Sequence, residues 1–381
     1  MIESKMNNLV NNINKSYLRD CLRRYLNNPS ISLDNIFVEP FKANTGDGKQ
    51  KTFFKIRIDL NEKISEFILK YLPETDGSIG LSKDLYYREV QFASSELYNK
   101  VSKIIQIPIV ATYINEEANE RWILMEDVSN SLKNFGPPTP PTADILKKIL
   151  YKTGQFHSLT WNDSNLIEFS PWLMKFEDFF KGGCKILQSA IEGKALDLWI
   201  QNYLDDNPEL IESFSVFLNW LNEDERHILQ KLIYNPDLIL DKLSKSADAV
   251  CHNDLYFPNV GWDNDELSLI DWEFVGVSPT AWDIYNLYSG IPCPDLKEEE
   301  AFEAYFSGVE AGGLKVDRIS WIKTYRQLDL ISILAFELKD LVPRAFSSKS
   351  SLPEHKKEFI KDHIRNMVKS VIHTYETLTN E

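Results

Sequence analysis

The first third of the chain combines one helical pattern with a series of short apolar runs. Between residues 3 and 27, apolar side chains recur at the spacing of an amphipathic helix, and the sequence Asn-Asn-Pro ends that pattern. A second helical pattern covers residues 85–97. Runs typical of β-strands occupy residues 35–42, 51–58, 66–73, 107–113 and 121–128. We therefore predict a five-stranded sheet accompanied by two helices.

A proline-rich segment separates this region from a longer, mostly helical one. Residues 129–143 include Gly-Pro-Pro-Thr-Pro-Pro, which neither a helix interior nor a central strand accommodates. From residue 144 onward the periodicity is helical, and a block at about 170–247 is rich in aromatic and acidic residues. We predict an N-terminal lobe (1–128), a connector (129–143) and a helical C-terminal lobe (144–381) that contains this block as an insertion.

Composition limits the classes of function. The chain has 381 residues, 43% of them hydrophobic, which suits two or three lobes with substantial cores. Its formal net charge of −15 would repel a phosphate backbone, so nucleic-acid binding is not expected. The acidity favours cationic or neutral partners, or it serves only to keep the protein dissolved.

Cysteine usage and hydropathy bear on the compartment. Cys21, Cys184, Cys251 and Cys293 are scattered without a C-x-x-C pair, as expected of reduced core thiols. No apolar run is long enough to span a membrane, and the first residues lack the apolar segment of a signal peptide. We expect a cytoplasmic protein without a membrane partner.

One pair of short motifs carries the chemistry. His252-Asn253-Asp254 is followed by Asn259 and then by Asp271. Asp254 is placed to accept the proton of a hydroxyl group, while Asn259 and Asp271 offer the oxygen ligands that magnesium prefers beside the β- and γ-phosphates of a nucleotide. We expect Val250 to open a loop before this motif, and residues 259–262 and 267–270 to form two short strands around a turn. Magnesium-dependent phosphoryl transfer is the chemistry that this spacing favours.

Three rival interpretations fit less well. A zinc site at His252 and Asp254 lacks a second histidine at useful spacing. A calcium loop at residues 263–265 lacks the glycine and the distal glutamate of an EF-hand. A nucleophilic triad built on His252 lacks a Gly-x-Ser-x-Gly elbow.

Upstream residues have both a structural and a functional interpretation. Lys70 lies within an apolar strand, either as an edge-strand charge that prevents aggregation or as a cation directed into a cleft. Glu89 on the following helix is positioned to hold it by an ion pair, which favours the cleft. Gly46 and Gly48 form a hairpin tip that can cover phosphates with its N–H groups, although such tips are common in β proteins.

The motif His-x-Asp-x-x-x-x-Asn, then Ile-Asp-Trp-Glu and Trp282-Asp283, resembles the aminoglycoside phosphotransferase and choline kinase-like branch of the protein-kinase-like fold. The glycine hairpin, strand lysine, helix glutamate and connector arrive in the order of that family. The resemblance covers most of residues 35–345 and is strongest over residues 250–287. It implies an α+β two-lobed fold with an antiparallel five-stranded N-terminal lobe and a mainly helical C-terminal lobe.

The resemblance also implies roles. Asp254 would be the catalytic base, and Asn259 and Asp271 the magnesium ligands. Lys70, fixed by Glu89, would bind phosphate. The backbone of Met125, Glu126 and Val128 would meet adenine. His252 and Asp283 would support the catalytic loop.

Departures from the protein-kinase pattern refine this interpretation. Asn253 replaces the arginine that would bind an activation-loop phosphate, and only residues 272–282 separate Asp271 from Asp283. Because no activation segment fits there, we expect an unregulated kinase of small molecules that uses Mg2+ and ATP, with GTP left open. A cationic antibiotic such as an aminoglycoside would suit the acidic insertion. Choline-like or sugar-like alcohols are the alternative acceptors. A nucleotide-binding pseudokinase or scaffold is the alternative from another class of function. The sequence leaves the oligomeric state open.

Overall fold

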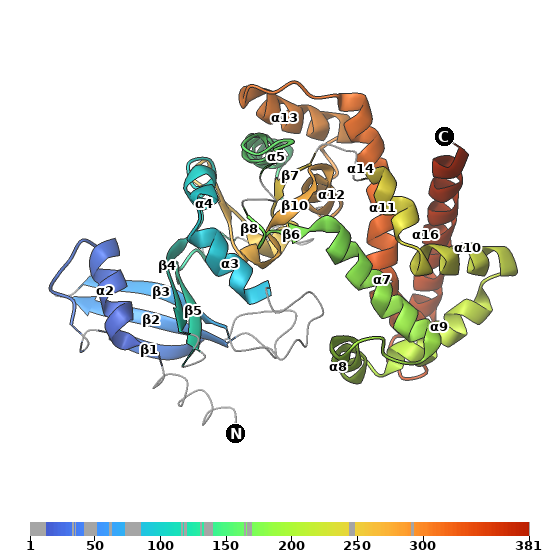
Figure 1. Ribbon diagram of the computed structural model, residues 1–381, viewed down its shortest axis with the longest axis horizontal. Helices are drawn as coiled ribbons and strands as arrows, with labels where there is room; N and C mark the ends of the chain where they lie inside the picture. The colour runs from blue at the N-terminus through green and yellow to red at the C-terminus, as the bar shows by residue number, and fades with distance from the viewer. Residues whose placement is uncertain are drawn as a thin grey trace.

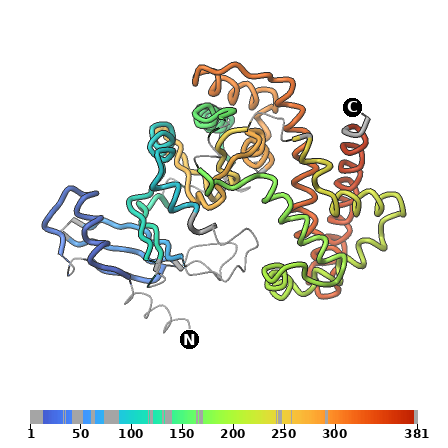
Figure 2. Tube along the Cα trace, in the orientation of Figure 1, coloured from blue at the N-terminus to red at the C-terminus, as the bar shows by residue number. Residues whose placement is uncertain are grey.

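The computed structural model describes residues 13–32, 34, 36–41, 52–60, 63–72, 85–115, 117, 120–129, 132, 140–163, 165, 170–243, 248–290 and 293–380. A β-sheet lobe lies at one end of the molecule and a large helical lobe at the other (Figure 1). The N-terminal part of the chain stays within the sheet lobe, and the chain then builds the helical lobe up to the C-terminus (Figure 2). Gly46 and Gly48 lie outside the described residues.

The N-terminal sheet has five strands in the order β1-β2-β3-β5-β4, and every neighbouring pair is antiparallel. Its strands are β1 (Ile36–Phe41), β2 (Thr52–Leu60), β3 (Lys63–Tyr71), β4 (Ile109–Asn115) and β5 (Glu120–Glu126). The predicted number of strands and their approximate positions are confirmed. β3 lies at the centre of the sheet, so Lys70 is not on an edge strand.

The two faces of this sheet are covered by different helices. Because side chains alternate along a strand, Phe67 and Leu69 of β3 point to one face. There they join a core with Leu18 and Leu22 of α2 (Lys15–Tyr25). Ile68 points to the other face and packs with Val90 of α3 (Leu85–Ala93). Lys70 shares the parity of Ile68, so it belongs to the α3 face.

The helical lobe consists mainly of long helices around one large apolar core. Its helices are α5 (Ala143–Ser158), α7 (Phe176–Glu192), α8 (Leu198–Asp206), α9 (Glu209–Trp220), α10 (Glu223–Tyr234), α11 (Asp237–Leu243), α12 (Ala281–Gly290), α13 (Glu298–Ala311), α14 (Arg318–Ser332), α15 (Leu338–Phe346) and α16 (Glu354–Asn380). A π-helical turn, η4 (Ile333–Glu337), joins α14 to α15. None of the helices in the described ranges is both long and apolar enough to cross a membrane.

Helices α5 and α13 approach closely (Figure 1) because each carries a glycine at the contact. A Cβ atom at Gly154 would lie 2.3 Å from the carbonyl oxygen of Tyr305, and one at Gly308 would lie 2.0 Å from that of Tyr151. Both distances are far inside van der Waals contact, so neither position accepts a side chain without moving backbone. This contact fixes α5, which carries His157, against the rest of the lobe.

Two small sheets shape the region between the lobes. β8 (Val260–Asp263) and β9 (Glu266–Leu269) form the predicted hairpin, whose turn residues Asn264 and Asp265 have φ of 49° and 61°. β6 (Met174–Lys175), β10 (Gly276–Pro279) and β7 (Asp248–Cys251) form a second sheet with β10 in the middle. The expectation that Val250 opens a loop is wrong, because β10 pairs with β7 and draws Val250 into a strand.

Other predicted boundaries shift in detail. The helix expected at residues 85–97 is two helices, α3 and α4 (Glu96–Val101), because Ser95 caps a new helix by accepting a hydrogen bond from the Tyr98 backbone N–H. Of the helix expected at residues 3–27, α2 occupies residues 15–25, and residues 3–12 lie outside the described residues. Most of the proline-rich connector also lies outside them.

Candidate active site

Lys70 is at the centre of a buried charge cluster between the lobes. Its side chain is 3% exposed, and its ammonium nitrogen lies 2.5 Å from Glu89 Oε2 and 2.5 Å from Asp271 Oδ1. Glu273 Oε2 lies 3.8 Å from the same nitrogen. The expected ion pair with Glu89 is therefore present, and the central position of β3 excludes the edge-strand interpretation of Lys70.

The charge state of Lys70 follows from these neighbours. Burial alone would lower the pKa of Lys70, but the carboxylates of Asp271, Glu89 and Glu273 outweigh it and raise that pKa well above its usual value. Lys70 is therefore fully protonated at neutral pH. A buried ammonium group among three carboxylates leaves a local excess of negative charge, which favours the approach of a cation.

Helix α3 is attached to the segment that carries Asp271. Glu89 Oε1 accepts a hydrogen bond from the Trp272 backbone N–H at 3.3 Å, and the ring of Phe92 stacks on Trp272 with centroids 4.4 Å apart. Arg88 donates from Nη1 to the Glu273 carbonyl oxygen at 2.9 Å and from Nε to the carbonyl oxygen of residue 172 at 3.0 Å. One face of α3 thus binds the residues immediately after Asp271, and the sequence prediction missed this role of Arg88.

The β8–β9 hairpin brings Asn259 and Asp271 to neighbouring positions. Val260 pairs with Leu269, and just beyond that pair the Ile270 backbone N–H donates to the Asn259 carbonyl oxygen at 3.1 Å. Asp271 follows with φ of 64° and begins a 3-10 turn, η3 (Trp272–Phe274). A left-handed backbone is uncommon for a residue other than glycine and most tolerable for Asp or Asn. It turns the chain sharply at the residue that contacts Lys70.

Asp254 and Asn259 are in direct contact. The Asn259 amide nitrogen donates to Asp254 Oδ2 at 2.8 Å and to the Asp254 carbonyl oxygen at 2.9 Å. Because its amide nitrogen is engaged in this way, the carbonyl oxygen of the Asn259 side chain is the atom suited to ligate a cation. The structure therefore brings the predicted base and one predicted metal ligand together.

Asp283 holds the loop that precedes Asp254. Its two carboxylate oxygens accept the backbone N–H groups of His252 and Asn253, each at 2.7 Å. Asn253 has φ of 67° and donates its side-chain amide to the Phe274 carbonyl oxygen at 2.8 Å. The position where a protein kinase has arginine therefore holds a short side chain that ties the loop to η3.

His252 is neutral and structural in its contacts. Burial lowers the pKa of His252. Its Nε2 lies 2.9 Å from the Ile270 carbonyl oxygen, which can only accept, so Nε2 carries the proton. The ring also packs against Trp272, with centroids 4.7 Å apart. His252 thus links the loop of Asp254 to the segment of Asp271.

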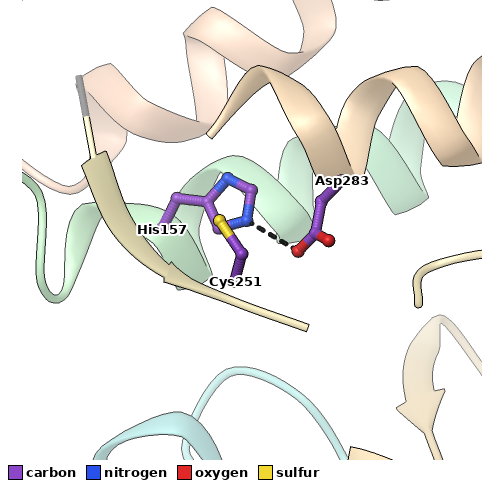
Figure 3. A group of neighbouring side chains, drawn as sticks. All are labelled: His157, Cys251 and Asp283. Atoms are coloured by element: carbon purple, nitrogen blue, oxygen red, sulfur yellow. Dashed lines mark hydrogen bonds and ion pairs between the residues drawn. The ribbon is translucent and has the colours of Figure 1, made fainter. Parts of the chain in front are cut away.

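His157, Cys251 and Asp283 lie together in the interior (Figure 3), and their ligand atoms are close enough to suggest a metal site. His157 Nε2 lies 3.1 Å from Asp283 Oδ2, and its Nδ1 lies 3.0 Å from the Tyr305 hydroxyl group. Burial, reinforced by the charge of Asp283, raises the pKa of the Cys251 thiol well above its usual value. Both ring nitrogens of His157 and both carboxylate oxygens of Asp283 are engaged in hydrogen bonds within the protein, so these residues support the loop.

The residues predicted to meet adenine lie at the end of β5, on the strand next to Lys70. Met125 pairs with Ile68 of β3 and is buried on the face that carries α3. Glu126 donates its backbone N–H to the Pro108 carbonyl oxygen at 2.8 Å, and its side chain accepts a hydrogen bond from the Tyr25 hydroxyl group. Val128 follows beyond the strand. These residues therefore border the same interlobe region as Lys70.

The donor set suits a magnesium ion. Asn259 and Asp271 supply hard oxygen atoms, and Asp271 is the most exposed carboxylate around Lys70, with a side chain 26% exposed against 1% for Glu89. Magnesium keeps several waters and needs few protein ligands, so a partly exposed carboxylate beside an amide oxygen fits it. Glu273, which sequence reasoning included only as part of the Asp-Trp-Glu motif, adds negative charge at this point.

Comparisons with known proteins identify the family and the fold. The sequence profile of the phosphotransferase enzyme family matches residues 111–314. Choline kinase from Cryptosporidium parvum Iowa II has a similar structure, with a TM-score of 0.54 and 14% sequence identity over 94% of this chain and 97% of that chain. Plasmodium vivax ethanolamine kinase gives a TM-score of 0.52 and 15% identity over 95% of this chain and 89% of that chain. No curated protein matches by sequence. The predicted α+β two-lobed kinase-like fold is confirmed.

Proposed function

The chain belongs to the phosphotransferase enzyme family, and we propose that it transfers the γ-phosphoryl group of ATP to a hydroxyl group of a small cationic acceptor. The observation that carries the proposal is the buried contact of Lys70 with both Glu89 and Asp271, beside the Asp254–Asn259 pair. Phosphoryl transfer depends mainly on positioning and on electrostatic stabilisation, which such a cluster provides.

Each residue has a defined part in this reaction. Asp254 accepts the proton of the acceptor hydroxyl group, and Asn259 fixes the direction of its carboxylate. Lys70, held by Glu89, presents its ammonium group to the phosphates. Asn259 and Asp271 would hold Mg2+, and this ion would supply positive charge to offset the charge of the nucleotide phosphates. The remaining predicted contacts, from Gly46 and Gly48 to phosphate and from Met125, Glu126 and Val128 to adenine, belong to the same proposal.

Support for a cationic acceptor comes from aromatic residues next to the catalytic loop. Trp282 donates its indole N–H to the Asn253 carbonyl oxygen at 3.2 Å and stacks on Tyr285, with ring planes 8° apart. Phe336 of the π-helical turn lies 5.8 Å from Trp282, between ring centroids. The Tyr285 hydroxyl group donates to Asp329 Oδ1 at 3.0 Å, so this carboxylate is engaged within the protein. Trp282 itself is buried, so an acceptor would meet the partly exposed rings of Tyr285 and Phe336, and aromatic faces attract ammonium groups.

The acidic helical insertion offers less support. Asp197 pairs with Lys185 at 3.3 Å, and Glu225 caps the start of α10 and also bonds to Arg365. These carboxylates are engaged within the protein. The aromatic group around Trp282 is therefore the better candidate for acceptor recognition, and it fits choline-like amino alcohols as well as aminoglycosides.

The test is an acceptor screen with the purified full-length protein. Release of ADP or GDP is measured with Mg-ATP or Mg-GTP and with aminoglycosides, choline, ethanolamine and neutral sugars. Choline and its uncharged isostere 3,3-dimethylbutanol form a matched pair. We expect the charged member of the pair to have a kcat/KM about tenfold higher, the ratio that roughly 1.4 kcal/mol of ammonium recognition gives.

Three other outcomes would count against parts of the proposal. Best turnover with neutral sugars would contradict a cationic acceptor while preserving the phosphotransferase. Faster phosphorylation of peptides than of any small alcohol would contradict a small-molecule kinase. Stabilisation by Mg-ATP in a thermal-shift assay without consumption of nucleotide on any acceptor would favour the scaffold alternative.

A further inference from the structure

A groove of about 960 Å3 lies in the helical lobe where α9 begins, α15 ends and α16 begins. α9 and α16 lie at the end of the molecule opposite the sheet lobe (Figure 1). Lys70, Asp254 and Asp271 do not line it. We call this feature the C-terminal groove. The groove lies outside the proposed catalytic site, and the proposed phosphoryl transfer does not require it.

The floor of the C-terminal groove is apolar and open. Pro343, Leu352 and Ile360 line it together with Phe359, whose surface is 75% exposed. Leaving a phenylalanine in water forgoes the stabilisation that burial would give, about 1.5–3 kcal/mol for a side chain of this size. An exposed aromatic residue beside further apolar side chains in a concavity is typical of an interaction site.

The rim of the groove is basic, in contrast to the rest of the protein. Arg344, Lys349 and Lys356 line it and are exposed, and no ion pair of these three side chains occurs among the described residues. His355 adds a further group that can carry positive charge, and Glu209 is the acidic side chain of the lining. This concentration of positive charge occurs on a chain with a formal net charge of −15. The groove is thus a local site of attraction for anions.

The form of the groove indicates what kind of anion it accepts. Its charged groups are exposed, and a single exposed ion pair contributes little, so a lone small anion would bind weakly. A peptide that carries several carboxylates can form several such ion pairs at once, and an apolar side chain of the same peptide can cover Phe359. An anionic membrane fits less well, because the charge of −15 repels an acidic surface whereas a narrow peptide meets only the local positive charge.

We propose that the C-terminal groove binds an acidic peptide segment of a partner protein, with an apolar side chain against Phe359 and carboxylates on Arg344, Lys349 and Lys356. Such a site would recruit the enzyme to a partner without using the catalytic cleft. The proposal is independent of the acceptor and of the phosphoryl-transfer reaction.

Fluorescence anisotropy of the full-length protein with a fluorescein-labelled peptide, Glu-Glu-Leu-Phe-Glu-Glu, tests this site. We expect saturable binding that weakens with salt. The double variant Lys349→Glu/Lys356→Glu and the variant Phe359→Ala should each weaken it about tenfold or more, the ratio for roughly 1.4 kcal/mol. Lys315→Glu and Ile319→Ala replace an exposed lysine and an exposed apolar residue outside the groove, and they should leave binding unchanged.

Several results would overturn the proposal. Equal binding by the groove variants and by the two control variants would remove the site, as would equal affinity for a Lys-Lys-Leu-Phe-Lys-Lys peptide. Binding to phosphatidylserine vesicles that the groove variants abolish, without peptide binding, would assign the surface to membranes. Self-association abolished by the same variants would assign it to a second copy of the chain. Phosphotransferase turnover, measured in parallel, should not change in any of these variants.

Discussion

Replacing Lys70 with Met tests the buried charge cluster directly. The substitution keeps most of the side-chain volume and removes the positive charge that Glu89, Asp271 and Glu273 share. The variant leaves three carboxylates near one another in a site where Glu89 is 1% exposed. Removing one partner of a buried ion pair costs about 3–5 kcal/mol, and we expect a loss of that size in the free energy of unfolding at about pH 8.

The pH dependence of this loss gives a second signature. In the wild type, the raised pKa of Lys70 means that its stabilising charge is present at all pH values below the ordinary lysine range and is lost only as the pH rises through the folded-state value. In the variant, protonation of the crowded carboxylates relieves their repulsion. The loss of stability should therefore shrink between about pH 8 and about pH 5, while wild-type stability changes little for this reason.

Urea unfolding followed by tryptophan fluorescence measures both effects. Lys55→Met is the matched control, because Lys55 pairs with Glu66 at 2.8 Å on the same sheet but both side chains are partly exposed. Its cost should be much smaller and nearly independent of pH. If the Lys70 and Lys55 variants lost equal stability, or if the Lys70 variant lost more at the lower pH, the charge of Lys70 would not stabilise the buried carboxylates.

Three further substitutions probe the support of the site. Arg88→Ala removes two hydrogen bonds to backbone carbonyls, one of them on Glu273, and should lower the free energy of unfolding in urea by about 2–4 kcal/mol. A smaller loss than that caused by replacing an exposed arginine would contradict its anchoring role. Asp283→Asn leaves one acceptor oxygen for two loop N–H groups and should lower kcat by about tenfold to a hundredfold, with KM for nucleotide nearly unchanged. A change in KM alone would contradict the role of Asp283 in holding the loop. Gly308→Ala places a Cβ 2.0 Å from the Tyr151 carbonyl oxygen. The variant should lose about 1–3 kcal/mol of stability, although alanine favours helices. A more stable variant would refute the close α5–α13 contact.

Sequence reasoning was strongest where local patterns determine structure. The apolar run at residues 66–73 predicted the strand, and the alternation of side chains along a strand puts Lys70 on the face that carries α3, where Glu89 lies. The hairpin turn at Asn264 predicted the pairing that brings Asn259 next to the segment of Asp271. These contacts follow from strand geometry and turn chemistry, which neighbouring residues encode.

Other features depend on contacts between distant segments. The sheet of β6, β10 and β7 was missed because its strands have two to four residues, too few to show a period. Arg88 looked like an ordinary helix residue, since its acceptors are backbone carbonyls that exist only once the lobes are packed. The left-handed backbone conformation of Asn253 likewise depends on a hydrogen bond to a distant segment, at Phe274.

The most direct measurement compares turnover and nucleotide binding in Asp254→Asn and Asp271→Ala. If Asp254 accepts the hydroxyl proton, the Asp254 variant should lose about 10²–10⁴-fold in kcat on the best acceptor while binding Mg-ATP almost as the wild type does. The Asp271 variant should instead bind Mg-ATP poorly, because it lacks a magnesium ligand. Undiminished turnover of the Asp254→Asn variant would contradict the assignment of this loop as the catalytic centre.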